Sequence, residues 1–127
     1  MTSGLEPPFL FHWKDLPIKA AARANLPANI SDRMLLLRLI AKQLRFPDYF
    51  SENWDALEEC LRDLSWLPAG RIILEHADVP LVRDVASAKV YVAILADATR
   101  KMTKSDHPLQ IIFPSGCIDQ IKWLLRL

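Results

Sequence analysis

The sequence of 127 residues contains only three glycines and two cysteines, and these shortages exclude several classes of protein. No Gly-rich phosphate-binding loop is present, and the HExxH and GxSxG motifs of common hydrolases are also missing. Cys60 and Cys117 lie in apolar surroundings without metal-ligand spacing, so we expect reduced core thiols rather than a disulfide framework. The three histidines are scattered, and we expect them to be structural or surface residues: His12, His76 and His107. The sequence therefore predicts no enzyme, no cofactor and no metal site.

Long hydrophobic runs are absent as well. The longest, Val90 to Ala96, is far shorter than the roughly 20 residues that a membrane-spanning helix needs. The N-terminal segment MTSGLEPPFLFHW has no basic region ahead of its apolar residues, so it lacks the form of a secretory signal. We therefore expect a soluble, cytoplasmic protein that does not bind a membrane.

What the sequence does contain is typical of a globular protein, with 51% hydrophobic and 24% charged residues. A chain of this length can bury one core, and we expect a single domain over residues 1–127. Three short apolar runs bounded by proline or glycine are predicted to be strands: Phe9 to Trp13, Arg71 to His76 and Leu109 to Phe113. The segment KDLPIKAAARANLPAN between the first strand and the first helix is predicted to be a loop or irregular.

Helices are predicted between these strands. DRMLLLRLIAKQLR is amphipathic and follows two good N-cap residues, Ser31 and Asp32. Further helices are expected over about 52–64, over 82–102 with a possible break near Ser87, and in CIDQIKWLLRL at the C-terminus. Because parallel strands need crossover helices, the order predicts an α/β fold with a small three-stranded parallel sheet layered with helices, plus a C-terminal helical extension over 114–127.

Acidic residues are concentrated in one stretch. Residues 48–63 hold six acids and one base, a local charge of −5, in a chain whose formal net charge is +1. The rest of the chain is therefore diffusely basic, which argues against a protein that binds nucleic acid directly through a basic patch.

Placing this stretch on a helical wheel separates two faces. Hydrophobic residues follow one stripe: Trp54, Leu57, Leu61 and Leu64. Acids follow the opposite stripe: Glu52, Asp55, Glu59 and Asp63. Glu58 falls at the border. The sequence thus predicts a helix that packs on the domain by one face and presents carboxylates to solvent by the other.

Two interpretations of the acidic face remain open at this point. Charged helix faces usually serve only as solvated surface. However, Asp55 and Glu59 form a like-charge i,i+4 pair, and Glu58, Glu59 and Asp63 lie toward the negative end of the helix dipole. Carboxylates at positions where they lower the stability of the helix indicate that their electrostatic field has a function. A rigid row of carboxylates imitates a run of phosphates. The favoured partner is then a protein whose active site holds RNA or DNA.

Two aromatic residues precede this helix in the segment PDYF. Large, stiff aromatics beside charge are common anchors of protein interfaces. For Phe50 we expect packing over the core, whereas Tyr49 could either cover the core or contact a partner.

The segment ISDRMLLLRLIAKQLRFPDYFSENWDALEECL, residues 30–61, resembles the helix, loop and acidic helix of the barstar family of intracellular ribonuclease inhibitors. Its most specific part is the series Pro-acid-Tyr-aromatic followed by Glu-Asn-x-Asp-Ala-Leu-x-acid-Cys-Leu. RIILEH, VAILADATRKM and LQIIF resemble later elements of the family, so the resemblance extends over about residues 30–113. It implies a three-stranded parallel sheet with helices packed on it.

The resemblance also implies a function, which is inhibition of a ribonuclease whose active site the acidic helix fills. Asp55 and Glu59 would be the principal carboxylates against catalytic Arg, Lys and His, and Tyr49 would contact the region of the catalytic His. Asn53 would make polar contacts from the loop, and Asp97 would lie at the edge of the interface. The implied partner is a basic extracellular or toxin ribonuclease, which makes this chain an antitoxin or immunity protein.

The sequence departs from the family pattern at the same surface. The second principal acid is an aspartate in the family and Glu59 here, while Glu58 replaces a tryptophan and Ser51 replaces a glycine. A Thr-Gly-Trp series after the helix is replaced by Arg62, Asp63 and Leu64. We include Glu58 and Asp63 among the partner-binding residues. The alternative is a binding module of the same fold with a partner other than a ribonuclease, or with weak self-association through the C-terminal extension.

Overall fold

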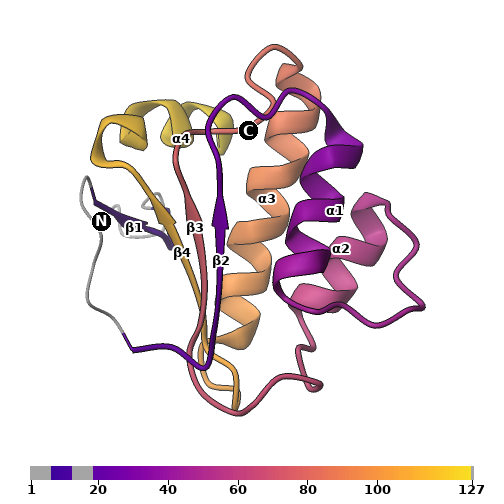
Figure 1. The fold of residues 1–127 in the computed structure, drawn as a ribbon. Coiled ribbons are helices and arrows are strands. Elements are labelled where there is room, and N and C mark those ends of the chain that lie inside the picture. The colour runs from indigo at the N-terminus through magenta and orange to yellow at the C-terminus, as the bar shows by residue number, and fades with distance from the viewer. Residues whose placement is uncertain (1–6, 13–18, 127) are drawn as a thin grey trace.

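The computed structural model describes residues 7–12 and 19–126, which form one parallel sheet and the helices around it (Figure 1). The strands are β1 (Leu10–Phe11), β2 (Ala22–Leu26), β3 (Ile72–His76) and β4 (Leu109–Phe113). The helices are α1 (Arg33–Gln43), α2 (Trp54–Leu61), α3 (Val85–Met102), the 3-10 turn η2 (Ser115–Cys117) and α4 (Ile118–Leu124). The sheet order is β1-β4-β3-β2, and every pairing is parallel.

The prediction of three strands is wrong, because the sheet of the described residues has four. The missed strand, β2, lies in the segment predicted to be irregular, and it pairs with β3 over its full length from Ala22 to Leu26. Its sequence, ARANL, alternates buried Ala24 and Leu26 with the more exposed Arg23 and Asn25. The predicted first strand is reduced to the two residues of β1 at the other edge of the sheet, and Trp13 lies outside the described residues.

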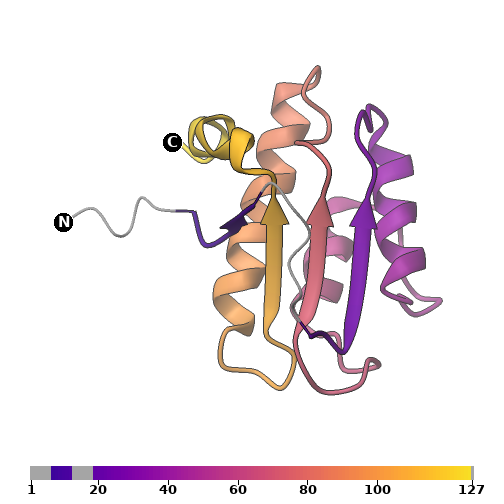
Figure 2. The same ribbon diagram turned by 60° about the vertical axis from the view of Figure 1, so that its left-hand side comes forward.

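Helices α1, α2 and α3 lie on one face of the sheet (Figure 2). The core lies between them and the strands. Helix α1 contributes buried Leu36, Leu37 and Ile40, and the largest fully buried side chains of the domain are Tyr91 and Phe113. Helix α1 begins where the sequence predicts, because Asp32 is its N-cap and its side chain accepts a hydrogen bond from the Leu35 amide at 3.0 Å.

The predicted bounds of the acidic helix are too wide. Helix α2 spans Trp54–Leu61 rather than about 52–64. Glu52 has φ of 53° and Leu64 has φ of 58°, and this left-handed conformation cannot continue an α-helix at either end. Helix α3 starts at Val85 rather than at Val82 and runs without interruption through Ser87, whose amide and hydroxyl both donate to the N-cap Asp84.

The C-terminal helix packs on the same domain. Helix α4 lies against α3 near the carboxyl ends of the strands (Figure 2), and it buries Ile121 and Leu124 there. Trp123 is 49% exposed, with the Lys89 ammonium 5.0 Å from the centre of its ring. No helix of the described residues is long and apolar enough to cross a membrane.

Candidate acidic interface

The acidic helix is fixed by its cap and by its apolar face. The Asn53 side chain is the N-cap and accepts a hydrogen bond from the Ala56 amide at 2.8 Å. Leu57 and Leu61 are fully buried, and the half-buried Trp54 contacts the Tyr91 ring on α3 at 6.2 Å between centroids. The side that faces the domain is therefore the one predicted from the wheel.

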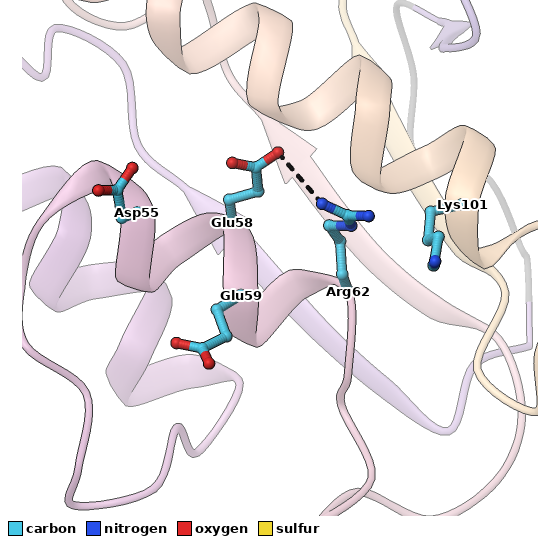
Figure 3. A pocket seen from close by; sticks show the side chains of 5 residues that line it. All are labelled: Asp55, Glu58, Glu59, Arg62 and Lys101. Atoms are coloured by element: carbon cyan, nitrogen blue, oxygen red, sulfur yellow. Dashed lines mark ion pairs between the residues drawn. The ribbon is translucent and has the colours of Figure 1, made fainter.

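The opposite side carries the carboxylates. Asp55 and Glu59 are exposed, and Glu58 is half-buried at the border (Figure 3). A depression of about 370 Å³ lies beside these three side chains and is lined on its other side by Arg62 and Lys101. Three acids and two bases thus meet on one open surface formed by α2, the residue that follows it and the last turn of α3.

Charges within this surface are partly paired. The Arg62 guanidinium lies 3.5 Å from a Glu58 carboxylate oxygen, and the two side chains are 42% and 33% exposed. At this exposure, the ion pair contributes little to folding, on the order of 0 to 1 kcal/mol. No ion pair forms to Asp55 or Glu59 among the described residues, and their carboxylates are available for a partner.

Two predicted members of the acidic stripe lie off the helix. Glu52 forms hydrogen bonds to the Arg38 guanidinium at 3.1 and 3.4 Å, and these bonds raise the pKa of Arg38 above its ordinary value. Asp63 is exposed in the turn that follows the helix. The acidic row on α2 is therefore shorter than the sequence predicts, and the rest of the charge is placed by the flanking turns.

Tyr49 lies next to the carboxylates. Its side chain is 64% exposed, the largest exposure among the large hydrophobic residues described. Partial desolvation raises the pKa of its hydroxyl, and the charges of Cys60, Asp63 and Glu59 raise it further. Tyr49 does not cover the core, whereas Phe50 does, in edge-to-face contact with Phe46 at 5.0 Å.

The two remaining predicted residues lie at the edges of this surface. Besides capping α2, Asn53 donates a long hydrogen bond of 3.5 Å to the Ser51 carbonyl, so its side chain already has a role in the fold. Asp97 is exposed on α3, 3.7 Å from Arg100 and one helical turn before Lys101. It does not line the depression.

Lys101 was not identified from the sequence. The sequence feature that could have indicated Lys101 is the basic pair at the end of α3, Arg100 and Lys101. Such a pair is an ordinary way to complement a helix dipole. Only the packing of α3 against α2 brings Lys101 to the acidic surface.

The described residues show no cluster of His, Cys, Asp and Glu that could hold a metal ion. Both cysteines are free thiols, with Cys60 buried and Cys117 half-buried. His76 is buried between the Ile112 carbonyl and the Tyr91 hydroxyl, and the His107 ring bonds the Leu67 carbonyl at 2.9 Å. These two histidines therefore have structural partners.

A comparison with known families places most of the chain in one of them. The model of the family described as Barstar (barnase inhibitor) matches residues 20–114. The matched range includes β2, which the resemblance noted from the sequence alone did not reach, and it contains every residue of the acidic surface. No curated protein matches the chain.

Proposed function

Since this chain belongs to the barstar family, which is a family of inhibitors rather than of enzymes, we propose that it inhibits a ribonuclease by filling the active site with the acidic face of α2. The observation that carries this proposal is the unpaired state of Asp55 and Glu59, which are exposed on a capped and docked helix beside an exposed tyrosine. Carboxylates held in this way can replace RNA phosphates against basic catalytic residues.

The roles of the individual side chains follow from their positions. Asp55 and Glu59 are one turn apart and form the centre of the interface. Tyr49 supplies a large, stiff contact area beside them, and Asp63 adds charge at the end of the helix. Glu58 is turned toward Arg62, so it contributes less free charge than its neighbours. Asn53 fixes the start of the helix, and Asp97 lies at the rim.

The helix is suited to this role because it is rigid before binding. Leu57, Leu61 and the N-cap hold it on the domain, so little conformational entropy is lost on association. Its exposed carboxylates also attract a basic partner through solution, which raises the association rate at low salt.

A second candidate function is supported by the two bases in the depression. Arg62 and Lys101 would repel a uniformly basic active site, and they favour a partner that carries acidic as well as basic groups. On this alternative, the same surface binds a protein other than a ribonuclease. Self-association through α4 is less favoured, because Ile121 and Leu124 are already buried within the domain.

The test is capture of basic ribonucleases on immobilised protein at low salt, followed by inhibition assays with each enzyme retained. We expect Asp55→Ala and Glu59→Ala each to weaken binding by about 2 kcal/mol or more, which is roughly thirtyfold in Kd, because each leaves a basic group of the partner unpaired. Binding should also weaken as salt is raised.

The matched control is Asp119→Ala, which removes an exposed carboxylate from the first turn of α4. It should bind like the parent protein. All three variants should melt within a few degrees of the parent, because exposed carboxylates contribute little to folding. If a ribonuclease is inhibited equally by the parent and by both α2 variants, the acidic face is not the inhibitory surface.

A further inference from the structure

Exposed apolar side chains gather on α3 and beside it. Six large hydrophobic residues are exposed in the part of the chain that the structure describes, and four of them belong to this region: Val82, Val85, Val90 and Trp123. Trp123 reaches the region from α4, which packs against α3 (Figure 2). Exposed apolar patches with polar residues around them mark surfaces that bind another molecule.

One exposed stripe of α3 has the spacing of a helix-packing surface. Ala86, Val90, Ala93 and Asp97 are all exposed, and they follow one another at intervals of four, three and four residues. This spacing puts them on one face of the helix, and it is the spacing at which two helices pack side by side. Alanine at two of the four positions lets a second helix approach closely. We call these four residues the outer stripe of α3.

The two ends of the outer stripe carry opposite charges. Arg83 precedes α3 and Asp97 ends the stripe, so Val90 stands midway, seven residues from each. Arg83 is exposed and forms no ion pair with the described residues. Asp97 lies 3.7 Å from Arg100, and the two side chains are 64% and 55% exposed. An ion pair as open as this one contributes little, so Asp97 can pair with another cation.

The charge nearest the middle of the outer stripe is held to one side. Lys89 is the neighbour of Val90, and its ammonium lies 5.0 Å from the centre of the Trp123 ring. This cation–π contact directs the ammonium toward α4. The middle of the stripe therefore presents Val90 between two alanines, and the charges lie at its ends.

This arrangement is complementary to itself. A second copy turned by 180° about an axis through Val90, perpendicular to α3, places its own α3 antiparallel to the first. Arg83 of each copy then meets Asp97 of the other, and this happens at both ends. Ala86 faces Ala93 in the same way, and the two Val90 side chains pack together. A second copy thus supplies by symmetry the order of charges that an unrelated protein would have to reproduce.

We infer that the outer stripe of α3 is the interface of a twofold-symmetric dimer of this chain. The test is the mass of the full chain in solution, measured by sedimentation velocity between about 1 and 500 μM at low salt. The average mass should rise with concentration from that of the 14.5 kDa chain toward that of the dimer. Amide NMR shifts of the isotope-labelled chain should change with concentration around residues 83–97 and at Trp123.

A substitution at the middle of the stripe tests the apolar contact. Val90→Glu places two carboxylates together on the axis, and the dimer should dissociate at least about tenfold more readily. Glutamate favours a helix at least as well as valine, so the exposed position keeps the fold. Leu35→Glu is the matched control, because it makes a similar change at a 46% exposed residue of α1, and it should dimerise like the parent.

Exchange of the end charges tests the orientation of the two copies. Arg83→Glu and Asp97→Arg should each weaken the dimer at least about tenfold, because each puts like charges together at both ends of the interface. The double variant exchanges the two charges and should recover the parent affinity within about threefold. The matched controls are Arg71→Glu and Asp106→Arg, which change exposed residues away from α3 and should dimerise like the parent.

Three results would overturn the inference. One is a chain that remains a monomer at about 500 μM. Another is a dimer whose affinity is the same in the parent and in Val90→Glu, which would place the contact on another surface. The third is a double variant that dimerises no better than its single variants, because antiparallel copies require the exchange to restore both pairs.

Discussion

Protonation of His76 should control how the stability of the fold depends on pH. The His76 ring is 3% exposed and stacks on Phe113 at 4.0 Å between centroids. Its Nδ1 lies 3.1 Å from the Ile112 carbonyl, which can only accept, so Nδ1 carries the proton. Its Nε2 then accepts the hydroxyl hydrogen of Tyr91 at 2.7 Å. The folded state therefore holds the neutral ring, and no described acid forms an ion pair with it.

Burial lowers the pKa of His76 from 6.5 to about 3, against a smaller opposing effect of the hydrogen bond to Ile112. Because the unfolded chain binds a proton that the folded chain does not, the free energy of unfolding falls as the pH drops from about 6.5 toward 3. By pH 5 the loss is roughly 2 kcal/mol, about 1.5 pH units at about 1.36 kcal/mol per unit. This value does not depend on the precise folded pKa, provided that it lies below about 4.

The measurement is urea unfolding at pH 8, 7, 6 and 5 for the parent and for His76→Gln, which cannot titrate. The variant should be less stable at pH 8, since it loses the stacking on Phe113, but its stability should fall less on acidification by about 2 kcal/mol. His107→Gln is the matched control, because it makes the same substitution at a histidine that is only half-buried and bonds the Leu67 carbonyl. If the parent and His76→Gln lose stability in parallel between pH 8 and 5, or if NMR shows His76 titrating near 6.5 in the folded protein, the reasoning is wrong.

Two further predictions concern the contacts of α2 and α3. Tyr91→Phe should reduce the free energy of unfolding by about 1 to 3 kcal/mol, because it leaves the buried Nε2 of His76 without a donor. Urea unfolding at pH 8 measures this loss. A change below about 0.5 kcal/mol would contradict the hydrogen bond. Asn53→Ala should cost about 1 kcal/mol of stability because the N-cap of α2 is lost, whereas Asn53→Asp should keep the cap and its stability. Thermal melts of both variants test this. Equal melting temperatures of the alanine and aspartate variants would argue against capping.

The elements that the sequence predicts well are those whose local residue pattern agrees with their environment in the fold. Strand β4 is observed over Leu109–Phe113, as predicted, because a short apolar run fits a strand buried in a parallel sheet. Helix α1 has its N-cap at Asp32 and buries Leu37 and Ile40 at the expected spacing. Local preference and tertiary environment agree at these positions.

The features that the sequence did not predict depend on tertiary contacts or on backbone conformations that the local residues do not favour. Strand β2 alternates small and polar residues, and alanine is weakly hydrophobic and a poor strand former, so its periodicity is not visible until β3 pairs with it. The ends of α2 are set by left-handed backbone at Glu52 and Leu64, and neither residue type favours that conformation. The same limit applies to Lys101, whose place beside the carboxylates depends on helix packing rather than on its neighbours in sequence.

The fold and the acidic surface of α2 are energetically separable. An eight-residue helix is too short to be stable by itself, so α2 depends on burial of Leu57 and Leu61 at about 1.5 to 3 kcal/mol each. Repulsion between Asp55 and Glu59 costs only roughly a few tenths of a kcal/mol. Because the apolar face outweighs this cost several-fold, the charged face can change its residues without loss of the helix. Charged residues such as Glu58 and Arg62 can therefore be replaced on this surface while the same fold continues to hold the helix in place.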